Sequence, residues 1–390
     1  MISSKQALKI IFEHIRPLGE EIADLSSILG RVLAQHVYSD VDIPPFDRSA
    51  MDGFAINSKD TSRIFEIIED IPSGKVPKKK IGQGQCARIM TGAVLPPGAD
   101  KVVMVEKTRL VGKKQMEIIR GDEKSNISPR GEDVRKGERV LKKGTEIRPQ
   151  EAAMMAACGQ TKVKVLRAPR LAIISTGSEL VEPQKKPARG RIRNTNSSML
   201  LLQLKKLGLE GQDLGIARDD PKITEKLIRK GLIVADVLIL TGGVSVGDYD
   251  FVATVLKKCG IKILFDKVAI KPGKPTTFGF KGKKYIFGLP GNPVSALITF
   301  ELFVAPALYK IMGKKTPSQF IKAILLDDFQ RRDAEREQYF PVLINRQGAL
   351  PLEFHGSGHM QALTLANGIM LIKRGIKRIP KGAEVDVRPI

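Results

Sequence analysis

The sequence is poor in aromatic residues: tryptophan is absent, and aromatic side chains make up only 5% of its 390 residues. Its basic residues are dispersed, apart from short runs such as Lys78, Lys79 and Lys80. Proteins that bind nucleic acids commonly combine clustered cations with aromatic stacking platforms. The sequence therefore does not favour nucleic-acid binding, and its net charge of +23 indicates either an oxyanion partner or simply a basic, solvated surface.

Cysteine is scarce as well, and its three residues, Cys86, Cys158 and Cys259, lie far apart without a C-x-x-C motif. Neither a disulfide framework nor a structural zinc site is predicted from such spacing. The N-terminal segment has no uninterrupted apolar core typical of an export signal. No uncharged apolar run reaches the length of about 18 residues that would indicate a membrane-spanning helix. We therefore expect a cytoplasmic protein that is not embedded in a membrane.

The first part of the chain changes pattern twice. Apolar residues at helical spacing over 5–16 and again over 22–29 predict helices, and Gly30 is a natural stop. Short β-like runs separated by Gly, Pro and Lys turns fill residues 39–137. A short helix is predicted from Pro149 to the glycine at 159. We expect a discontinuous helical domain of residues 1–38 and 138–166 that is interrupted by a β-rich insert of residues 39–137.

The second part begins with alternating strands and helices over residues 167–313, which predicts an α/β domain with a mainly parallel sheet. Ligands bind such sheets beyond the carboxyl ends of the strands. Strand-like runs return after about residue 313, and they predict a β-barrel-like C-terminal domain over 314–390. The expected fold class is thus multidomain, α/β plus β.

A glycine-rich turn follows the apolar strand that ends at Leu240. Its glycines would let backbone N–H groups approach an anion, and the next helix would add its positive end. Alone, such a turn is equally well explained as a tight connection. Carboxylates in or near it indicate magnesium, which prefers oxygen ligands shared with a substrate phosphate. Asp219 and Asp220, at the end of an earlier strand, have the alternative role of capping the following helix. The turn's relevant residues are Gly242, Gly243, Ser245, Gly247, Asp248 and Asp250.

Three further turns end strands of the same region. Lys271 and Lys274 stand between prolines in a stiff turn, where they would pair with an oxyanion or form only an exposed basic turn. Ser295 falls in the first turn of a helix that begins at Pro293, beside free N–H groups, with Asn292 as a candidate N-cap. Glu179, in the turn after Thr176, is suited to hold a ribose, a pterin amine or a metal.

One pair of histidines, His355 and His359, has the spacing of helical metal ligands. Two glycines lie between them and no third ligand is evident, so we do not expect a metal site there.

Seven segments, taken together and in order, resemble the molybdopterin molybdenumtransferase family, which includes the C-terminal domain of gephyrin. The resemblance covers almost the whole chain. The segments are PPFDRSAMDGFAI (44–56), RIMTGAVLPPGAD (88–100), RGEDV (130–134), STGSEL (175–180), LTGGVSVGDYD (240–250), KPGKPTTFG (271–279) and GLPGNPVSALITFELFVAPAL (288–308).

The resemblance implies four domains, an elongated homodimer and a magnesium-dependent enzyme. Its substrates would be adenylyl-molybdopterin and molybdate, and its products AMP and the molybdenum cofactor. Further partners would be the pterin adenylyltransferase and the enzymes that accept the cofactor.

The resemblance also assigns roles by motif. Asp52, Thr91 and Asp133 match functional positions of the β-insert, which would face the partner subunit's α/β domain. The acidic set for adenylyl-pterin and magnesium would be Glu179, Asp219 and Asp250. The anion site would use Lys271, Lys274, Pro275 and Ser295, with Arg336 and Ser357 added by weaker local similarity. Thr176 and the glycine-rich turn would bind the pterin substrate. One departure is Ser178, where the family commonly has Asp.

Three alternatives remain at the level of sequence. A stand-alone pterin adenylyltransferase would share the α/β domain but leaves both β-regions unexplained. A non-catalytic scaffold that keeps the fold is disfavoured because Asp52, Glu179, Asp250 and Lys274 are all present. Insertion of tungstate in place of molybdate cannot be separated by sequence, because the two oxyanions are so alike.

Overall fold

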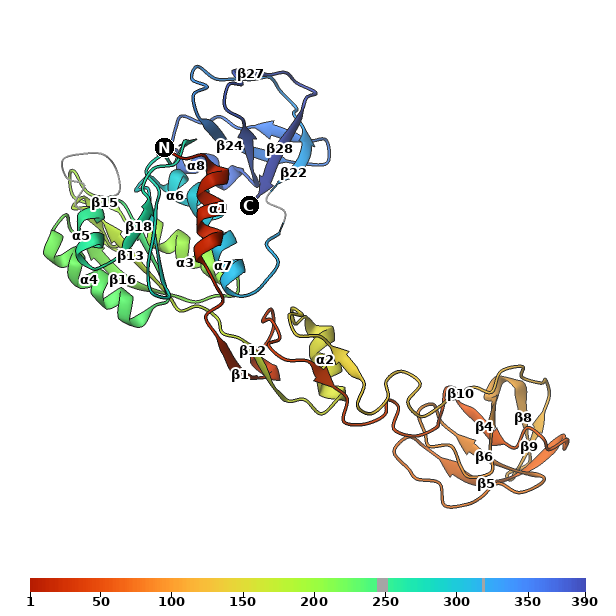
Figure 1. Cartoon of the computed structure of the whole chain (residues 1–390). Coiled ribbons are helices and arrows are strands. Elements are labelled where there is room, and N and C mark those ends of the chain that lie inside the picture. The colour runs from red at the N-terminus through yellow and green to blue at the C-terminus, as the bar shows by residue number, and fades with distance from the viewer. Residues whose placement is uncertain (244–251, 318–319) are drawn as a thin grey trace. The chain divides into compact units, whose positions relative to one another are not determined.

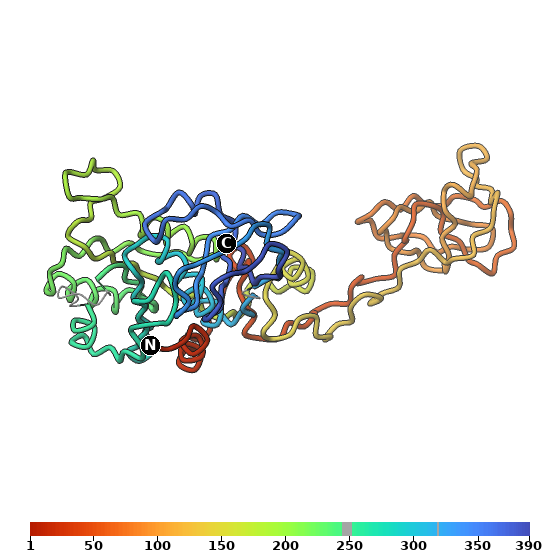
Figure 2. Tube along the Cα trace, turned by 90° about the horizontal axis from the view of Figure 1, so that it is seen from above, coloured from red at the N-terminus to blue at the C-terminus, as the bar shows by residue number. Residues whose placement is uncertain are grey.

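The computed structural model describes residues 1–243, 252–317 and 320–390. The chain forms two compact units. Unit 1 comprises Met1–Glu21, Gly30–Val32 and Val165–Ile390, and unit 2 comprises Ile22–Leu29 and Leu33–Lys164. Both chain termini belong to unit 1, as the trace in Figure 2 shows.

A six-stranded sheet forms the centre of unit 1 (Figure 1). Its first four strands in spatial order run parallel, with Leu171 opposite Val237 and Val237 opposite Tyr285. The fifth strand runs antiparallel to both the fourth and the sixth strand. The mainly parallel sheet expected from the sequence is therefore confirmed. In spatial order the strands are β16 (Gly211–Ala217), β13 (Leu171–Thr176), β17 (Val237–Thr241), β21 (Lys284–Leu289), β20 (Thr277–Lys281) and β18 (Lys262–Phe265).

Helices cover both faces of this sheet. Alternate residues of each strand point to opposite faces, so each strand contributes to two separate cores. Ile173 and Ile239 pack in the larger core, while their neighbours Ile174 and Leu240 pack in the second core on the other face. The helices that pack in the first core are α1 (Ser4–His14), α3 (Asn196–Lys206), α6 (Pro293–Thr299) and α7 (Ala305–Ile311). The second core takes up α4 (Pro221–Val234) and α5 (Val252–Lys258). Full burial on both faces explains why these strands read as nearly continuous apolar runs.

Among the described residues, one long apolar helix belongs to the first core. Residues Pro293–Ile311 form α6, a π-helical turn at Phe300–Val304 and α7, and by length and composition this helix could cross a membrane. However, 89% of its apolar window is buried inside the protein. Its hydrophobicity is thus accounted for by its place in the core.

The C-terminal segment adds a second six-stranded sheet to unit 1. In spatial order its strands are β19 (Ile270–Lys271), β24 (Glu337–Ile344), β26 (Gly368–Ile372), β28 (Glu384–Pro389) and β22 (Ile321–Ile324), with β25 (Ala349–Pro351) paired to β24. Its pairing path runs from β19 to β22, and a single parallel bridge between Leu325 and Ala349 joins the end of β22 to β25. The barrel-like closure expected from the sequence is not confirmed. Smaller elements of unit 1 are α8 (Met360–Leu365), the pair β23 (Phe329–Gln330) and β27 (Arg378–Ile379), and the pair β14 (Leu180–Val181) and β15 (Ile192–Arg193).

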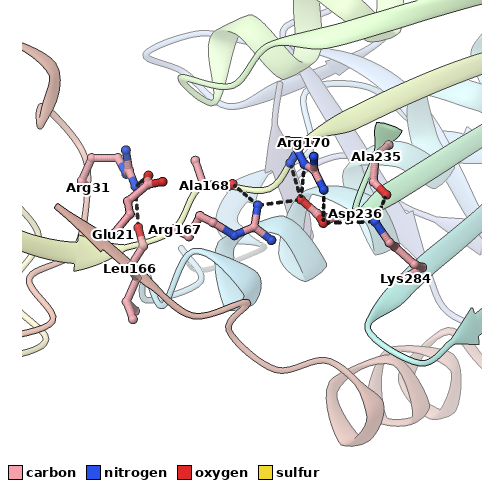
Figure 3. A network of polar contacts seen from close by, with 9 residues as sticks. All are labelled: Glu21, Arg31, Leu166, Arg167, Ala168, Arg170, Ala235, Asp236 and Lys284. Carbon is pink, nitrogen blue, oxygen red and sulfur yellow. Dashed lines mark hydrogen bonds and ion pairs between the residues drawn. The ribbon is translucent and has the colours of Figure 1, made fainter. Parts of the chain in front are cut away.

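A buried carboxylate fixes the start of the central strands (Figure 3). Asp236, which is only 4% exposed, immediately precedes β17 and accepts hydrogen bonds from Arg167 Nη1 at 2.8 Å and from Arg170 N at 2.9 Å. Lys284, at the start of β21, lies 3.5 Å from the same carboxylate. Burial raises the pKa of Asp236, but the hydrogen bonds from Arg167 and Arg170 outweigh this and hold the pKa far below its usual range. Asp236 is therefore charged in the folded protein at neutral pH.

Unit 2 is built around a third six-stranded sheet, whose two faces carry separate small cores. In spatial order its strands are β7 (Lys101–Met104), β4 (Gly53–Ile56), β6 (Gln85–Ile89), β5 (Ile64–Ile71), β9 (Gln115–Ile118) and β8 (Thr108–Val111). Unit 2 also contains two separate short strand pairs, β10 (Ile127–Ser128) with β3 (Arg48–Ser49) and β11 (Arg139–Leu141) with β2 (Val37–Tyr38). The helix expected at Pro149 is present as α2 (Pro149–Ala157), and Glu151 accepts a hydrogen bond from Arg148 N at 2.9 Å at its start.

The helix expected over residues 22–29 is wrong. Residues Glu20–Asp24 form the strand β1, which pairs with β12 (Lys162–Leu166), and Leu25–Ser27 form a 3-10 turn. Ile22 and Leu29, which the helical pattern placed on a buried face, are 69% and 72% exposed. The only apolar residues of β1 are Ile22 and Ala23, which do not alternate, so pairing with the distant β12 and not the apolar spacing determines this strand.

Candidate functional site

A cavity of about 670 Å³ lies where the loops after the parallel strands of unit 1 converge. It is built entirely from unit 1, and the C-terminal segment contributes part of its wall. It is thus located beyond the carboxyl ends of the strands, where an α/β sheet is expected to bind its ligand. The cavity brings together these residues predicted from the sequence: Thr176, Glu179, Asp219, Gly242, Gly243, Lys271, Lys274, Pro275, Ser295, Arg336 and Ser357.

The first glycines of the turn after β17 pack tightly against the end of β13. Gly242 and Gly243 have φ values of 84° and 61°, in the left-handed region that favours glycine. A Cβ atom on Gly242 would lie 2.4 Å from the carbonyl oxygen of Thr176, and one on Gly243 would lie 2.7 Å from Thr176 Oγ1. Close contact between two cavity loops therefore requires glycine at both positions. The remaining predicted residues of this turn, Ser245, Gly247, Asp248 and Asp250, lie outside the described residues.

Two carboxylates, Glu179 and Asp219, line the cavity. Asp219 Oδ2 accepts a hydrogen bond from the backbone N of Ser178 at 2.8 Å, which connects the loops after β13 and β16. Asp220 has the alternative role weighed for it: its Oδ1 accepts from Lys222 N at 2.7 Å and from Ile223 N at 3.1 Å, as the N-cap of α4. Neighbouring aspartates are thus divided between the cavity and the helix.

The oxygen atoms of these carboxylates are of the kind that magnesium prefers as ligands. Among the residues that the structure describes, no group of three or more His, Cys, Asp and Glu is arranged to hold a metal ion. Magnesium does not need such a group, because it is commonly held by one or two carboxylates together with waters and substrate phosphate. Glu179 and Asp219 fit that requirement. His355 and His359 stack with ring centroids 4.9 Å apart, and His355 Nε2 contacts Glu353 at 3.0 Å.

The basic side of the cavity depends on an unexpected strand pairing. β19, which contains Lys271, pairs in parallel with the first residues of β24, so that Lys271 lies opposite Gln338. This pairing brings Arg336, just before β24, to the turn that carries Lys271 and Lys274. The turn is held by hydrogen bonds from Val268 N to Lys274 O at 2.9 Å and from Thr276 Oγ1 to Gly273 O at 2.7 Å.

The start of α6 contacts the C-terminal segment through Ser357. Asn292 Nδ2 donates to Ser357 Oγ at 2.8 Å, and Val294 N donates to Ser357 O at 3.3 Å. Ser295, in the first turn of α6, is 3% exposed and lines the same cavity. The structure therefore places Ser357 beside Ser295, as the weak local similarity had implied.

The charged residues of the wall are Arg193, Lys271, Lys274 and Arg336 against Glu179 and Asp219. Among the residues that the structure describes, four cations and two carboxylates line the cavity, an excess of positive charge. Such a balance suits an anionic ligand and leaves carboxylates available for a cation.

A buried polar network that the sequence pattern does not reveal supports this wall. Ser175 Oγ donates to Asn194 Oδ1 at 3.1 Å, Asn194 Nδ2 donates to Ser197 Oγ at 3.0 Å, and Thr241 Oγ1 donates to Ser175 Oγ at 3.3 Å. All four residues are at most 4% exposed. In the sequence, residues 194–198 look only like the polar start of a helix, and nothing in that pattern distinguishes a buried network from a cap.

Unit 2 contains the other predicted residues, and two of them are in direct contact. Thr91 donates to Asp52 Oδ1 from both its backbone N and its Oγ1, each at 2.7 Å. These hydrogen bonds hold the pKa of Asp52 below its usual range. Asp133 is exposed in the same unit, and its backbone N donates to Ile43 O at 3.0 Å.

Comparisons with known families match nearly the whole chain in three consecutive parts. Residues 2–159 match the MoeA N-terminal region (domain I and II), residues 172–310 match a family described as "Probable molybdopterin binding domain", and residues 322–390 match the MoeA C-terminal region (domain IV).

Two full-length relatives carry the same name, molybdopterin molybdenumtransferase. The protein of Staphylococcus epidermidis is 39% identical over 405 residues, which cover 99% of this chain and 95% of the relative. That of Staphylococcus aureus is 37% identical over 399 residues, with the same coverage. Among solved structures, the molybdopterin biosynthesis MoeA protein from Pyrococcus horikoshii is 33% identical, with a TM-score of 0.85 and coverage of 100% of this chain and 99% of that chain.

Proposed function

Because this chain belongs to the molybdopterin molybdenumtransferase family, we propose that it catalyses the magnesium-dependent insertion of molybdate into adenylyl-molybdopterin with release of AMP. Membership of the family confirms the expectation of a transferase of molybdenum cofactor biosynthesis. The observation that carries the proposed reaction is the convergence of acidic, basic and hydroxyl side chains from separate loops on one cavity.

The reaction has to hold two anionic substrates together. Lys271 lies in β19, which pairs with β24, Lys274 follows in the next turn, and Arg336 directly precedes β24, so the fold sets the backbone positions of all three cations before substrate arrives. Fixed cations stabilise anionic groups without the reorganisation that water would need. The chain's cysteines Cys86, Cys158 and Cys259 are all buried, and none lines the cavity, in accord with a substrate that supplies its own sulfur ligands.

Molybdate would bind at the basic side of the cavity, with Lys274 and Arg336 supplying charge and Ser295 and Ser357 supplying hydroxyl donors. A tetrahedral dianion suits directed donors combined with positive charge. The Ser357 hydroxyl is already positioned by its hydrogen bond from Asn292. This arrangement needs no metal ligand for the oxyanion itself.

The acidic side of the cavity would bind adenylyl-molybdopterin together with magnesium. Glu179 and Asp219 would hold the ion, with Asp250 as a third carboxylate that the family resemblance suggests. Magnesium supplies charge neutralisation at the phosphates that are cleaved. Thr176, Gly242, Gly243 and Pro275 would shape the wall against which the pterin substrate lies. The family resemblance assigns Ser245, Gly247 and Asp248, which lie outside the described residues, to the same ligand.

The family resemblance further supports a homodimer in the cytoplasm, in which Asp52, Thr91 and Asp133 of one subunit would complete the partner's site. We also propose the division into residues 1–38 with 138–166, 39–137, 167–313 and 314–390. The gaps between the matched ranges lie near its boundaries at 167 and 314, whereas residues 2–159 match as one region. Against that division, α1 packs in the core of unit 1 with Phe300 and Leu308. The pterin adenylyltransferase and cofactor-accepting enzymes are the proposed partners.

Incubation with adenylyl-molybdopterin, magnesium and either molybdate or tungstate tests the proposal. AMP release and activation of a cofactor-free molybdenum enzyme should both depend on the oxyanion. Activation only with tungstate would identify a tungstate-inserting homologue. Absence of AMP release with both oxyanions would contradict the proposed reaction and favour a scaffold role.

A further inference from the structure

The basic wall of the cavity also contains a neutral amide. Gln338, in β24, lines the cavity and is 8% exposed. It lies opposite Lys271 of the parallel strand β19. Paired residues of neighbouring strands point to the same face of a sheet, as do residues two apart along one strand. Gln338 therefore shares a face with Lys271 and with Arg336, which line the cavity as well.

A buried arginine distinguishes the two ends of this amide. Arg331 Nη1 lies 3.5 Å from Gln338 Oε1. A guanidinium can only donate hydrogen bonds, so the oxygen end of the amide must face it. The nitrogen Nε2 is consequently at the other end, and within the part of the chain that the structure describes it donates to no acceptor.

The unpaired Nε2 is accessible from the cavity. Among the described residues that are not exposed, the unpaired side-chain atoms sealed from solvent are Asn196 Oδ1 and Thr224 Oγ1. Gln338 Nε2 is unpaired without being sealed, so it carries part of the small accessible surface of this residue. Because Gln338 lines the cavity, that surface belongs to the cavity wall. The wall thus presents an N–H donor beside Lys271 and Arg336.

Arg331 places a positive charge behind this donor. It is 9% exposed, and over the described ranges its other acceptors are the backbone oxygens of Ile376 at 2.7 Å, Lys373 at 2.7 Å and Arg336 at 3.0 Å. All of these acceptors are uncharged. A cation that donates to the oxygen of an amide polarises it and makes the N–H at the other end a stronger donor.

A polarised N–H donor among cations suits a tetrahedral oxyanion, which binds directed donors and positive charge together. We propose that Gln338 Nε2 donates a hydrogen bond to the bound oxyanion, while Arg331 behind it holds the amide in the donating orientation. This inference rests on the proposed function, because it adds a ligand to the molybdate site of Lys274, Arg336, Ser295 and Ser357.

Calorimetric titration of the full-length protein with molybdate tests the inference. Gln338→Met keeps the length of the side chain but removes the donor without adding charge. Its dissociation constant for molybdate should rise about tenfold, the effect of one hydrogen bond to a charged group. Binding of AMP should stay within about twofold of wild type, since a hydrogen bond to the oxyanion does not contribute to it.

Gln338→Glu is the second variant, because it has nearly the same shape and its carboxylate would pair with Arg331 in the folded protein. It should therefore fold, yet bind molybdate more weakly than Gln338→Met, since a negative charge replaces the donor. Gln347→Glu is the matched control: it adds the same charge at an exposed residue of the C-terminal segment that does not line the cavity, and it should bind molybdate like wild type.

Wild-type affinity for molybdate in either Gln338→Met or Gln338→Glu would overturn the inference. Equal loss of molybdate and AMP binding in Gln338→Met would also overturn it, because the side chain would then support the wall in general. Lys274→Gln separates these results from failure of the proposed site. Weakened molybdate binding in Lys274→Gln but not in Gln338→Met overturns the role of Gln338 alone, whereas wild-type protein that binds no molybdate contradicts the proposed oxyanion site and the inference with it.

Discussion

At the scale of single residues, Lys274 is the cation whose role is most sharply testable. Its backbone is fixed by the hydrogen bond from Val268 N, so the side chain emerges from an ordered turn of the cavity. Lys274→Gln keeps much of the length and a donor but removes the charge. We expect half-saturation by molybdate to rise about tenfold or more, because an ion pair is lost, while binding of adenylyl-molybdopterin stays nearly unchanged.

Lys283→Gln is the matched control, because Lys283 is exposed in a turn and does not line the cavity. It should leave half-saturation by molybdate unchanged. Wild-type half-saturation in Lys274→Gln would refute the assignment to the oxyanion, and equal loss of pterin binding would move Lys274 to the pterin phosphate.

Asp219 is the described carboxylate that best reports on magnesium. Asp219→Asn is nearly isosteric and keeps an oxygen that can accept from Ser178 N, so the loop should stay intact. Removal of the charge should raise the magnesium concentration needed for half-maximal AMP release, since carboxylates are the preferred protein ligands of this ion. Asp220→Asn changes the adjacent N-cap of α4 and should lower thermal stability without altering the magnesium requirement. Equal magnesium dependence of wild type and Asp219→Asn would remove Asp219 from the metal site.

At the scale of elements, Asp236 connects the start of β17 to the segment that leads into β13. Its carboxylate accepts hydrogen bonds from Arg167 and Arg170 (Figure 3). Asp236→Asn removes the charge that accepts these hydrogen bonds but leaves cations that are partly exposed, and we expect unfolding to become easier by about 2 kcal/mol. Urea denaturation measures this change. Glu182→Gln, which removes an exposed partner of Lys185, should leave the urea midpoint unchanged.

The same carboxylate predicts how stability depends on pH. The folded-state pKa of Asp236 lies below the unfolded value of about 3.9, so its contribution is fully present above that pH. Stability should therefore fall as the pH drops below about 4, because protons then bind the unfolded chain first. Asp236→Asn should show a shallower fall over this range, and parallel pH profiles for the two proteins would contradict the prediction.

Local sequence patterns predicted most of the helices and strands but not which strands pair with each other. The apolar strands that become β13, β17 and β21 and the helix from Pro293 to Ile311 were predictable, because burial on both faces leaves a continuous apolar signal. β1 was not, since its assignment depends on pairing with β12, more than a hundred residues away in the sequence. The pairing of β19 with β24 was likewise invisible, although it determines where Arg336 lies.

The site was predictable where a residue type is costly to replace. Gly242 and Gly243 carry a clear signal because only glycine fits beside Thr176. Asn194 and Asn196 do not, because asparagine at a helix start is ordinary, and only the three-dimensional contacts reveal one amide as fully paired and the other as half-paired.

At the scale of the whole molecule, the open question is how the two units contribute to one reaction. Asp52 and Thr91 form a hydrogen-bonded pair in unit 2. The hydrogen bonds from Thr91 lower the pKa of Asp52, which is charged at neutral pH. The cavity, in contrast, is lined by unit 1 alone. If unit 2 of one subunit completes the cavity of its partner, inactivating changes in different units should complement each other in a mixed dimer.

We therefore expect that Asp52→Ala and Lys274→Ala chains, each inactive in molybdate insertion alone, regain activity when mixed as heterodimers. One of the two sites in such a dimer would combine an intact unit 2 with an intact cavity, while the other would carry both defects, so activity should approach half the wild-type value per dimer. Differently tagged chains, purified through both tags, provide verified heterodimers for the assay. Mixing Glu179→Ala with Lys274→Ala is the control: both changes lie in the cavity of unit 1, so every site remains defective and no rescue is expected. Activity in the control as well as the test pair would indicate contaminating wild-type protein, because no combination of the two control chains contains an intact cavity. Verified Asp52→Ala and Lys274→Ala heterodimers without activity would contradict sites shared between subunits.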